Sequence, residues 1–301
     1  MSTTLPVAME HKATRRASVF RDLVALTKPS IVLMTLLTAG WGLGIAPQST
    51  SWSVILACLL GTALSVGSAN AFNMWLERDV DKLMTRTRLR PLPDGRLQPV
   101  VALVFAIVTG AASIVVLAIW VNTLTTVLST LAIVVYAAVY TPMKRVSSAA
   151  LPVGAIAGAM PPLLGWTAAT NQLSAPGLLL FGVLFVWQLP HFLAISMFRK
   201  AEYERAGIRI VPVVYGDGPT RWLIVLTTLG LLIVSAALAA TDAVGVVYLG
   251  IAVLMGVAGS ALALRGLGRT VDPGWPRRYF FATLGYLPAL AFGMFLDALL
   301  R

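Results

Sequence analysis

Long apolar stretches separated by short polar segments dominate this chain. Nine of the stretches come close to the roughly 20 residues that an α-helix needs to cross the hydrocarbon core of a bilayer. The predicted spans are residues 24–46, 52–76, 98–121, 124–142, 149–169, 176–198, 220–240, 243–264 and 279–299. The pattern therefore predicts an all-α membrane protein in which nine transmembrane helices form one bundle.

The composition excludes several other classes of protein. Hydrophobic residues make up 58% of the 301 residues and charged residues 12%, whereas soluble domains carry about 25% charged residues. So little charge could not cover the surface of a water-soluble fold. A single cysteine, Cys58, excludes a disulfide framework within the chain. Two histidines, His11 and His191, are too few for a histidine-rich metal site.

The basic residues predict the orientation. The net charge is +11, and if the spans alternate in direction, 22 of the 23 lysines and arginines lie on one side and only Arg301 on the other. Lysine and arginine mark the cytoplasmic side. We therefore expect a cytoplasmic N-terminus and an outer C-terminus in the cell (inner) membrane, and no nucleic-acid partner. Residues 1–20 are expected to be a mobile cytoplasmic arm, and residues 21–301 one polytopic domain.

The polar segment after the second span carries a stripe of acidic and amide side chains. Asn73, Glu77 and Asp81 follow one another at intervals of four and share a face if the helix persists. Like charges at this spacing repel, so a cation must meet them. Oxygen ligands of this kind suit Mg²⁺. The alternative is a solvated helix end in which the carboxylates pair with Arg78 and Lys82.

Three arginines at alternate positions follow the acidic stripe. Arg86, Arg88 and Arg90 precede Pro91, which ends the stretch. The planar guanidinium matches phosphate oxygens, so acids followed by bases fit a polyanion held both directly and through a metal. The positive-inside rule alone would explain the arginines, but it would not explain the acidic residues at the end of a membrane span.

A second polar segment follows the sixth span and repeats this theme. Glu202 lies 125 residues after Glu77, each behind an even-numbered span, which predicts two four-helix halves plus a final helix. His191 shares a helical face with Glu202 if Pro190 does not disturb the helix. Polar groups inside a span are costly and mark a functional interior. The alternative is a structural histidine packed near Gln188.

These motifs resemble the intramembrane aromatic prenyltransferases, and more closely their protoheme IX farnesyltransferase (heme O synthase) branch. The acidic stripe is shared across the superfamily, whereas residues 187–192 (WQLPHF) resemble the heme branch. The matching stretches are residues 26–29, 73–81, 84–92, 95–96, 140–145, 157–166, 187–192, 198–200, 203, 206–207 and 211–213.

The resemblance implies a nine-helix bundle that binds farnesyl diphosphate through Mg²⁺ and transfers the farnesyl group to a vinyl group of protoheme IX, giving heme O. A downstream heme A synthase is a candidate partner. The implied catalytic residues are Asn73, Glu77, Asp81 and His191. The implied metal ligands are Asn73, Glu77, Asp81 and Glu202. The implied diphosphate-binding residues are Lys28, Arg86, Arg90, Lys144, Arg145 and Lys200. The implied heme-binding residues are Trp187, His191 and Tyr203.

The chain departs from the pattern of this family at several positions. The family usually has an acid where Ala201 stands, so the second metal site is weakened. The other departures are glutamate for aspartate at 77 and 202, Ser30 in place of arginine, and Arg209-Ile210 in place of Pro-Met.

Three other functions stay open on the sequence. A prenyltransferase acting on a quinone precursor or a chlorophyll-type acceptor would share the acidic stripe. A small-solute transporter would also have many apolar spans, but its paired broken helices would lie near the middle of the bilayer. A non-catalytic assembly factor for an oxidase is the third.

Overall fold

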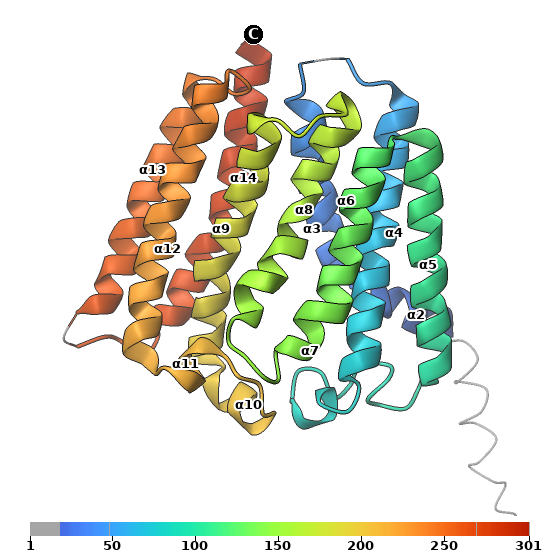
Figure 1. Ribbon diagram of the computed structural model, residues 1–301. Helices are drawn as coiled ribbons and strands as arrows, with labels where there is room; N and C mark the ends of the chain where they lie inside the picture. Colours follow the sequence, from blue (N-terminus) through green and yellow to red (C-terminus); the bar gives the residue numbers. More distant parts are fainter. Residues whose placement is uncertain (1–18, 48, 269, 301) are drawn as a thin grey trace, which may run out of the picture.

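The computed structural model describes residues 19–47, 49–268 and 270–300, and its regular elements are helices (Figure 1). Residues 1–18 of the predicted arm lie outside the described residues. The elements are α2 (Val19–Thr27), α3 (Pro29–Gly44), α4 (Trp52–Glu77), η1 (Asp81–Leu83), α5 (Pro99–Trp120), α6 (Thr123–Val134), η2 (Val135–Tyr140), α7 (Thr141–Met143), α8 (Ala150–Thr170), α9 (Ala175–Phe198), α10 (Lys200–Arg205), α11 (Val211–Val214), α12 (Asp217–Leu238), η3 (Ala239–Thr241), α13 (Val246–Leu264), η4 (Arg265–Leu267) and α14 (Trp275–Leu300).

The predicted membrane-spanning architecture is confirmed. In the described part of the chain, eight helices are long and apolar enough to cross a membrane, and the pair α2 and α3, bent by 44°, brings the number to nine if the pair counts as one span. The bend falls at Lys28, whose backbone is left-handed, with φ 53° and ψ 72°. Pro29 follows and disfavours a right-handed helical conformation at the residue before it. The first predicted span, 24–46, is therefore two helices rather than one.

The helices pack as two groups that meet at α8. The first group is α3, α4, α5 and α6, and the second is α9, α12, α13 and α14; α8 contacts α3, α4 and α6 on one side and α9 on the other. Gly42 and Gly165 lie where α3 and α8 touch, and a Cβ on either would overlap backbone of the facing helix. Small residues allow such close approach in lipid, so these glycines fix the distance between the two helices.

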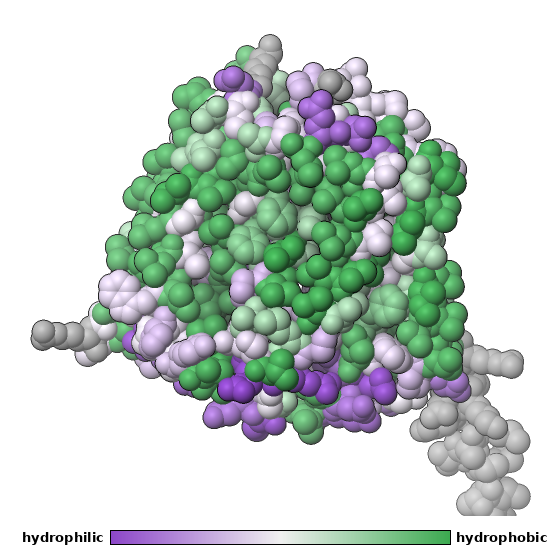
Figure 2. Space-filling view, in the orientation of Figure 1, coloured by the Kyte–Doolittle hydropathy of each residue, from purple (hydrophilic) through white to green (hydrophobic). Residues whose placement is uncertain are grey.

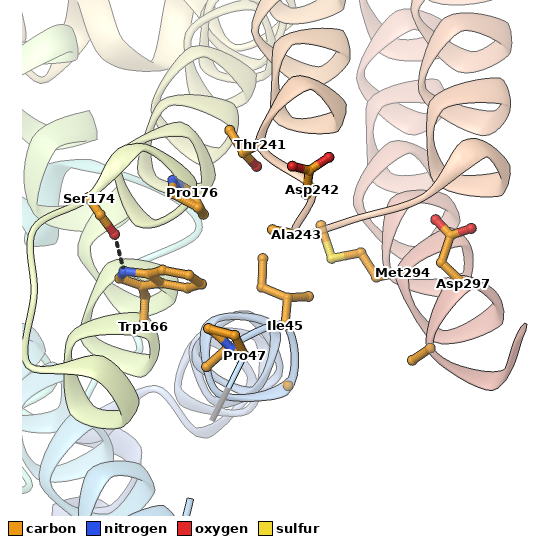
Figure 3. A pocket seen from close by; sticks show the side chains of 13 residues that line it. Ile45, Pro47, Trp166, Ser174, Pro176, Thr241, Asp242, Ala243, Met294 and Asp297 are labelled. Carbon is orange, nitrogen blue, oxygen red and sulfur yellow. Dashed lines mark hydrogen bonds between the residues drawn. The ribbon is translucent and has the colours of Figure 1, made fainter. Parts of the chain in front are cut away.

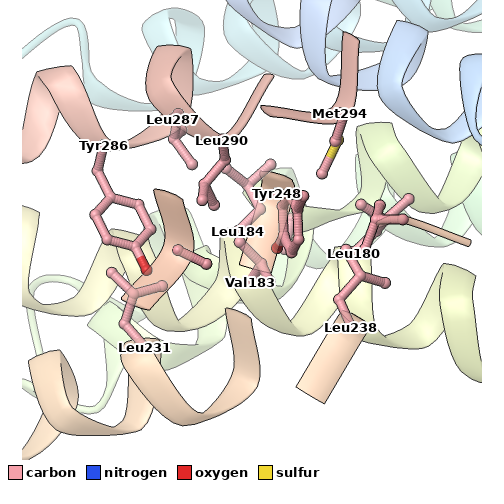
Figure 4. Packing of buried hydrophobic residues seen from close by; sticks show 13 residues of the cluster. Leu180, Val183, Leu184, Leu231, Leu238, Tyr248, Tyr286, Leu287, Leu290 and Met294 are labelled. Carbon is pink, nitrogen blue, oxygen red and sulfur yellow. The ribbon is translucent and has the colours of Figure 1, made fainter. Parts of the chain in front are cut away.

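The second group encloses the largest apolar core. Leu180, Val183 and Leu184 of α9 pack against Leu231 of α12 and Tyr248 of α13, together with side chains of α14 (Figure 4). The outer face of the bundle is also apolar, and Figure 2 shows a broad hydrophobic belt between two polar ends. A bundle in lipid requires an apolar outer surface as well as a packed interior, because the hydrocarbon core offers no water to polar groups.

The polar connections gather at one end of the bundle. The segments between α4 and α5, α7 and α8, α9 and α12, and α13 and α14 all lie at the lower end of Figure 1, and the marked C-terminus lies at the upper end. The lower end also carries the strongest hydrophilic colouring in Figure 2. The basic loops therefore share one side, as alternating spans predict.

Candidate active site

Two of the predicted acidic-motif residues lie in the last turns of α4. Asn73 Nδ2 donates a hydrogen bond to Glu77 Oε2 at 2.7 Å, and both side chains are buried. The helix ends at Glu77, and Asp81 begins the short helix η1 after a turn. The prediction that one continuous helical face carries all three residues is therefore wrong at Asp81.

Both carboxylates of the motif form buried ion pairs, Glu77 with a distant part of the chain and Asp81 with the loop that follows it. Glu77 Oε1 lies 2.5 Å from Lys144 Nζ, and Asp81 Oδ2 lies 2.7 Å from Arg90 Nη1. The Glu77 and Asp81 side chains are only 11% and 4% exposed. A buried carboxylate is stable only when a cation and hydrogen bonds compensate for its lost hydration, so these pairs hold the polar connections against the end of α4.

The alternative pairing with the neighbouring bases is wrong. Arg78 and Lys82 instead contact Asp79, whose side chain is 70% exposed. Asp79 thus forms the solvated surface pairs, while Glu77 and Asp81 face the interior. In the sequence, the exposed Asp79 is only two positions from each of the two buried acids.

Two further side chains complete the surroundings of Asn73. Lys28 Nζ donates to Asn73 Oδ1 at 3.3 Å, from the bend between α2 and α3. Asn73 Nδ2 also donates to Thr141 Oγ1 at 3.2 Å. Thr141 directly follows η2, a π-helical segment, and π-helical turns are common at functional sites. Thr141 lies within the motif of residues 140–145, but nothing in the sequence distinguishes it from the other residues of that motif.

We call this group the acid–base cluster. Its members are Lys28, Asn73, Glu77, Asp81, Arg90 and Lys144. The charges of Glu77, Asp81, Arg90 and Lys144 all act on the Lys28 ammonium. Three basic side chains lie among two carboxylates, an arrangement that suits an anionic ligand.

Glu202 ties the second polar connection to the first. Its Oε1 accepts from the backbone N–H of Arg86 at 3.2 Å, and its Oε2 accepts from Arg199 Nη1 at 3.1 Å. Burial alone would raise the pKa of Glu202, but these donors and their charges hold the pKa below its ordinary value. The Arg209 N–H also donates to the carbonyl of Lys144 at 3.1 Å. The bond from Arg86 to Glu202 therefore holds the two acid-bearing connections side by side, and Arg209 joins the second of them to the segment between α7 and α8.

The remaining predicted diphosphate ligands lie in different surroundings. The Arg86 and Arg145 side chains are exposed, and Arg145 Nη2 donates to the carbonyl of Leu76 at 3.4 Å. Lys200 Nζ pairs with Asp217 of α12 at 2.9 Å. Their assignment to a diphosphate stays a prediction.

The predicted heme-binding residues of α9 form an aromatic group against α14. The His191 ring stacks on Trp187 with centroids 4.6 Å apart, and His191 Nδ1 lies 2.7 Å from Thr283 Oγ1. Trp187 Nε1 donates to the backbone carbonyl of Thr283 at 2.8 Å. No signal in the sequence pointed to Thr283, because its motif-bearing partners are about 90 positions earlier in the chain. Gln188 bonds instead to the carbonyls of Ala155 and Leu184.

The predicted shared face of His191 and Glu202 does not exist. α9 ends at Phe198, and Arg199 leaves the helical conformation with φ −109° and ψ 12° before α10 begins. Tyr203 of α10 packs against Met84 in the first polar connection. Tyr203 therefore belongs to the contact between the two connections, apart from the aromatic group around His191.

The donor set near the acid–base cluster fits a magnesium ion that binds mainly through its substrate. In the described residues, no three side chains of His, Cys, Asp or Glu converge on one point. Glu77 and Asp81 nonetheless offer buried carboxylate oxygens, and Mg²⁺ typically takes one or two carboxylates together with phosphate oxygens and water. The arrangement suits a metal that arrives with a diphosphate rather than a permanently bound ion.

A large cavity lies at the opposite end of the bundle. It has a volume of about 530 Å³ and is bordered by Trp166, Asp242, Met294 and Asp297 (Figure 3). The Asp297 carboxylate accepts N–H bonds from the first residues of α13 and so caps that helix. Among the described residues that line this cavity there is no lysine or arginine, so this part of the lining lacks the basic side chains of the acid–base cluster.

Comparison with known proteins identifies the family. Residues 35–285 match the UbiA prenyltransferase family. The chain belongs to this family. The protoheme IX farnesyltransferase of Anaeromyxobacter dehalogenans is 43% identical over 294 residues, which is 98% of this chain and 99% of the relative. The protoheme IX farnesyltransferase of Sorangium cellulosum is 52% identical over 241 residues, 80% of this chain and 86% of the relative.

Solved structures of UbiA-type proteins share the fold. A digeranylgeranylglyceryl phosphate synthase superposes with a TM-score of 0.80 at 12% identity, covering 94% of this chain and 99% of the other. A UbiA homolog from Archaeoglobus fulgidus, bound to GPP and Mg²⁺, gives a TM-score of 0.69 at 17% identity, covering 91% of this chain and 99% of the other. This UbiA family member is a prenyltransferase with the fold of these proteins.

Proposed function

We propose that this UbiA prenyltransferase transfers the farnesyl group of farnesyl diphosphate to a vinyl group of protoheme IX, with heme O and diphosphate as products. One observation carries the proposal: relatives named protoheme IX farnesyltransferase are 42 to 52% identical over most of the chain. The acid–base cluster supports the proposal, because it supplies the charges that a departing diphosphate requires.

The cluster stabilises the negative charge that develops on the leaving group. The C–O bond of the farnesyl diphosphate breaks, an allylic cation forms, and both electrons of the bond go to the diphosphate. Lys144 and Arg90 lie beside buried carboxylates, where positioned charge acts more strongly than in water. Lys28 adds a third basic side chain at the same end of α4. The farnesyl tail would lie among the apolar side chains of the bundle.

Of the four predicted magnesium ligands, Asn73, Glu77, Asp81 and Glu202, we assign Glu77 and Asp81 to the ion. A bound Mg²⁺ supplies further positive charge to the diphosphate oxygens. Asn73 holds Glu77 by a hydrogen bond and so positions one carboxylate. Glu202 attaches the loop of Arg86 to α10, and we propose that this contact orders the loop so that Arg86 binds the diphosphate. Arg145 and Lys200 would bind the diphosphate as well.

The acceptor is held by the aromatic group on α9. The vinyl group attacks the allylic cation, a C–C bond forms, and water then adds a hydroxyl group while a proton is released. His191 and Trp187 are held by their contacts with Thr283, and we assign them to protoheme; Tyr203 lies apart from them, beside Met84, and is left out of this assignment. The enzyme lies in the cell membrane with its N-terminus in the cytoplasm, and a heme A synthase is the partner that would consume heme O.

The decisive experiment compares acceptors. Membranes that contain the chain are incubated with farnesyl diphosphate and Mg²⁺, and either protoheme IX or a quinone precursor is added. The expected result is a pigment with the mass of heme O from protoheme alone. Farnesylation of the quinone precursor alone would contradict the heme assignment while keeping a prenyltransferase, and no product with either acceptor would contradict both.

A further inference from the structure

The hydroxyl group of Thr283 contacts two groups at once, a backbone carbonyl and a ring nitrogen of His191. Thr283 Oγ1 lies 2.6 Å from the carbonyl oxygen of Phe280 and 2.7 Å from His191 Nδ1. A carbonyl oxygen can only accept, so the single hydroxyl proton of Thr283 lies on the bond to Phe280. Thr283 Oγ1 therefore accepts from His191, and the ring carries its proton on Nδ1.

The other ring nitrogen is then left with a free lone pair. The described contacts of His191 are the rings of Trp187, Phe192 and Phe280 and the Thr283 hydroxyl. No carboxylate among them would balance a positive charge, and a lone charge buried inside a span is very costly. The neutral ring with the proton on Nδ1 satisfies every contact, and it presents Nε2 as an acceptor.

The orientation of the ring is fixed as well as its tautomer. Thr283 also accepts a bond from Trp187 Nε1 at its backbone carbonyl, and Trp187 stacks on the His191 ring. One residue of α14 therefore holds two residues of α9. His191 lies seven residues before the end of α9, which places it roughly 10 Å inside the bundle from the polar end.

We infer that Thr283 is a positioning residue that holds His191 in the Nδ1–H tautomer, so that Nε2 binds the iron of protoheme. This inference rests on the proposed function, because it takes protoheme as the acceptor. Histidines that bind metals donate their second ring N–H to a neighbouring acceptor in this way, and loss of that acceptor weakens metal affinity about 10- to 100-fold. Ligation of the iron would fix the position of the macrocycle and so of the vinyl group.

The test measures heme binding by the full chain in detergent or lipid discs. Ferric protoheme is titrated into the wild type and into Thr283→Val, which removes the hydroxyl group and keeps the shape. The Soret band of the wild type should show an axial imidazole ligand. Thr283→Val should lose this band and bind protoheme about 10-fold or more weakly. Thr283→Ser should restore both, because it returns the hydroxyl group.

Thr228→Val is the matched control. Thr228 is a buried threonine of α12 whose Oγ1 bonds to a carbonyl of its own helix and to the Tyr279 hydroxyl of α14. Thr228→Val removes the same kind of hydroxyl hydrogen bond without changing the contacts of His191, so the heme spectrum should not change. In steady-state assays, Thr283→Val should raise the KM for protoheme and leave the KM for farnesyl diphosphate unchanged.

Two results would overturn the inference. One is a wild-type Soret band without an imidazole ligand, and the other is a Thr283→Val protein with the wild-type band and affinity. Formation of heme O is assayed separately on the same preparations. Heme O synthesis by an enzyme whose spectrum does not depend on Thr283 would reject the positioning role and keep the proposed function.

Discussion

The charged residues of the acid–base cluster are held by partners outside their own helical segments. Glu77 at the end of α4 meets Lys144 beyond α7, and Asp81 of η1 meets Arg90 of the following loop. Asp79, between these two acids, points to solvent. Each buried charge depends on its partner, because an unpaired charge in such a place is strongly unfavourable.

Asp81→Asn tests the cluster at this scale, with Asp79→Asn as its control. The substitution keeps the shape of the side chain but removes the charge beside Arg90 and one assigned magnesium ligand. We expect kcat for farnesyl transfer to fall by about 100-fold or more, the usual cost of losing one positioned charge. Asp79→Asn should retain activity, since the Asp79 side chain is 70% exposed. Equal activity of the two variants in a product-mass assay would contradict the assigned role of Asp81.

Glu202→Gln tests the attachment between the two polar connections. The expected result is a several-fold rise in the KM for farnesyl diphosphate with a smaller change in kcat, because the loop of Arg86 loses a charged anchor. Glu204→Gln, on the same short helix but exposed, is the control. Because the pKa of Glu202 is lowered, its carboxylate is charged above the ordinary glutamate pKa. The charged anchor is lost only as the pH falls through the lowered pKa. The wild-type KM should therefore stay constant from neutral to mildly acidic pH, and an acid-induced rise in that range would contradict this anchor.

Two irregular elements bring the cluster together. The left-handed backbone at Lys28 divides the first span and directs its side chain to Asn73. The π-helical segment η2 precedes Thr141, which accepts a bond from the same asparagine. A regular helix at either place would change the direction of the side chain that now meets Asn73, so the site depends on the irregularities.

The sequence was sufficient for the spans but not for these irregularities. The length of an apolar stretch indicates burial in lipid, and the positions of the arginines indicate the side of the membrane. Both signals are local to each segment, so the nine spans and the position of the polar connections were predictable. The end of α4 before Asp81, the partners of Glu77 and the bond from His191 to Thr283 depend on contacts between segments up to about 90 residues apart. No local pattern reports such contacts, and this is why the predicted shared faces failed.

Gly165→Ala tests the contact between α3 and α8. A Cβ at position 165 would overlap the carbonyl of Ala39, whereas a Cβ at Gly40 of α3 meets no atom within 4 Å. We expect Gly165→Ala to destabilise the bundle by about 1–3 kcal/mol, the usual cost of overpacking. Gly40→Ala should be neutral or slightly stabilising, because alanine favours helix. Thermal unfolding in detergent would compare them, and equal melting temperatures would contradict the close approach.

The distribution of charge over the whole molecule predicts which end faces the cytoplasm. The basic connections and the acid–base cluster lie at one end, and the C-terminus lies at the other (Figure 1). The positive-inside rule places the basic end in the cytoplasm. A charged substrate such as a prenyl diphosphate would then reach the cluster from the cytoplasm without crossing the bilayer.

Cysteine labelling tests this orientation directly. Cys58 is the only cysteine of the chain and is buried, so Cys58→Ala gives a background without thiols. Glu204→Cys then reports the basic end and Gln172→Cys the connection between α8 and α9, both at exposed positions. A membrane-impermeant maleimide should label Gln172→Cys in intact cells and Glu204→Cys only in inside-out vesicles, and a permeant maleimide should label both. Labelling of Glu204→Cys in intact cells would place the diphosphate site outside, where a cytoplasmic prenyl diphosphate could not reach it, and the proposed entry of the substrate would be wrong.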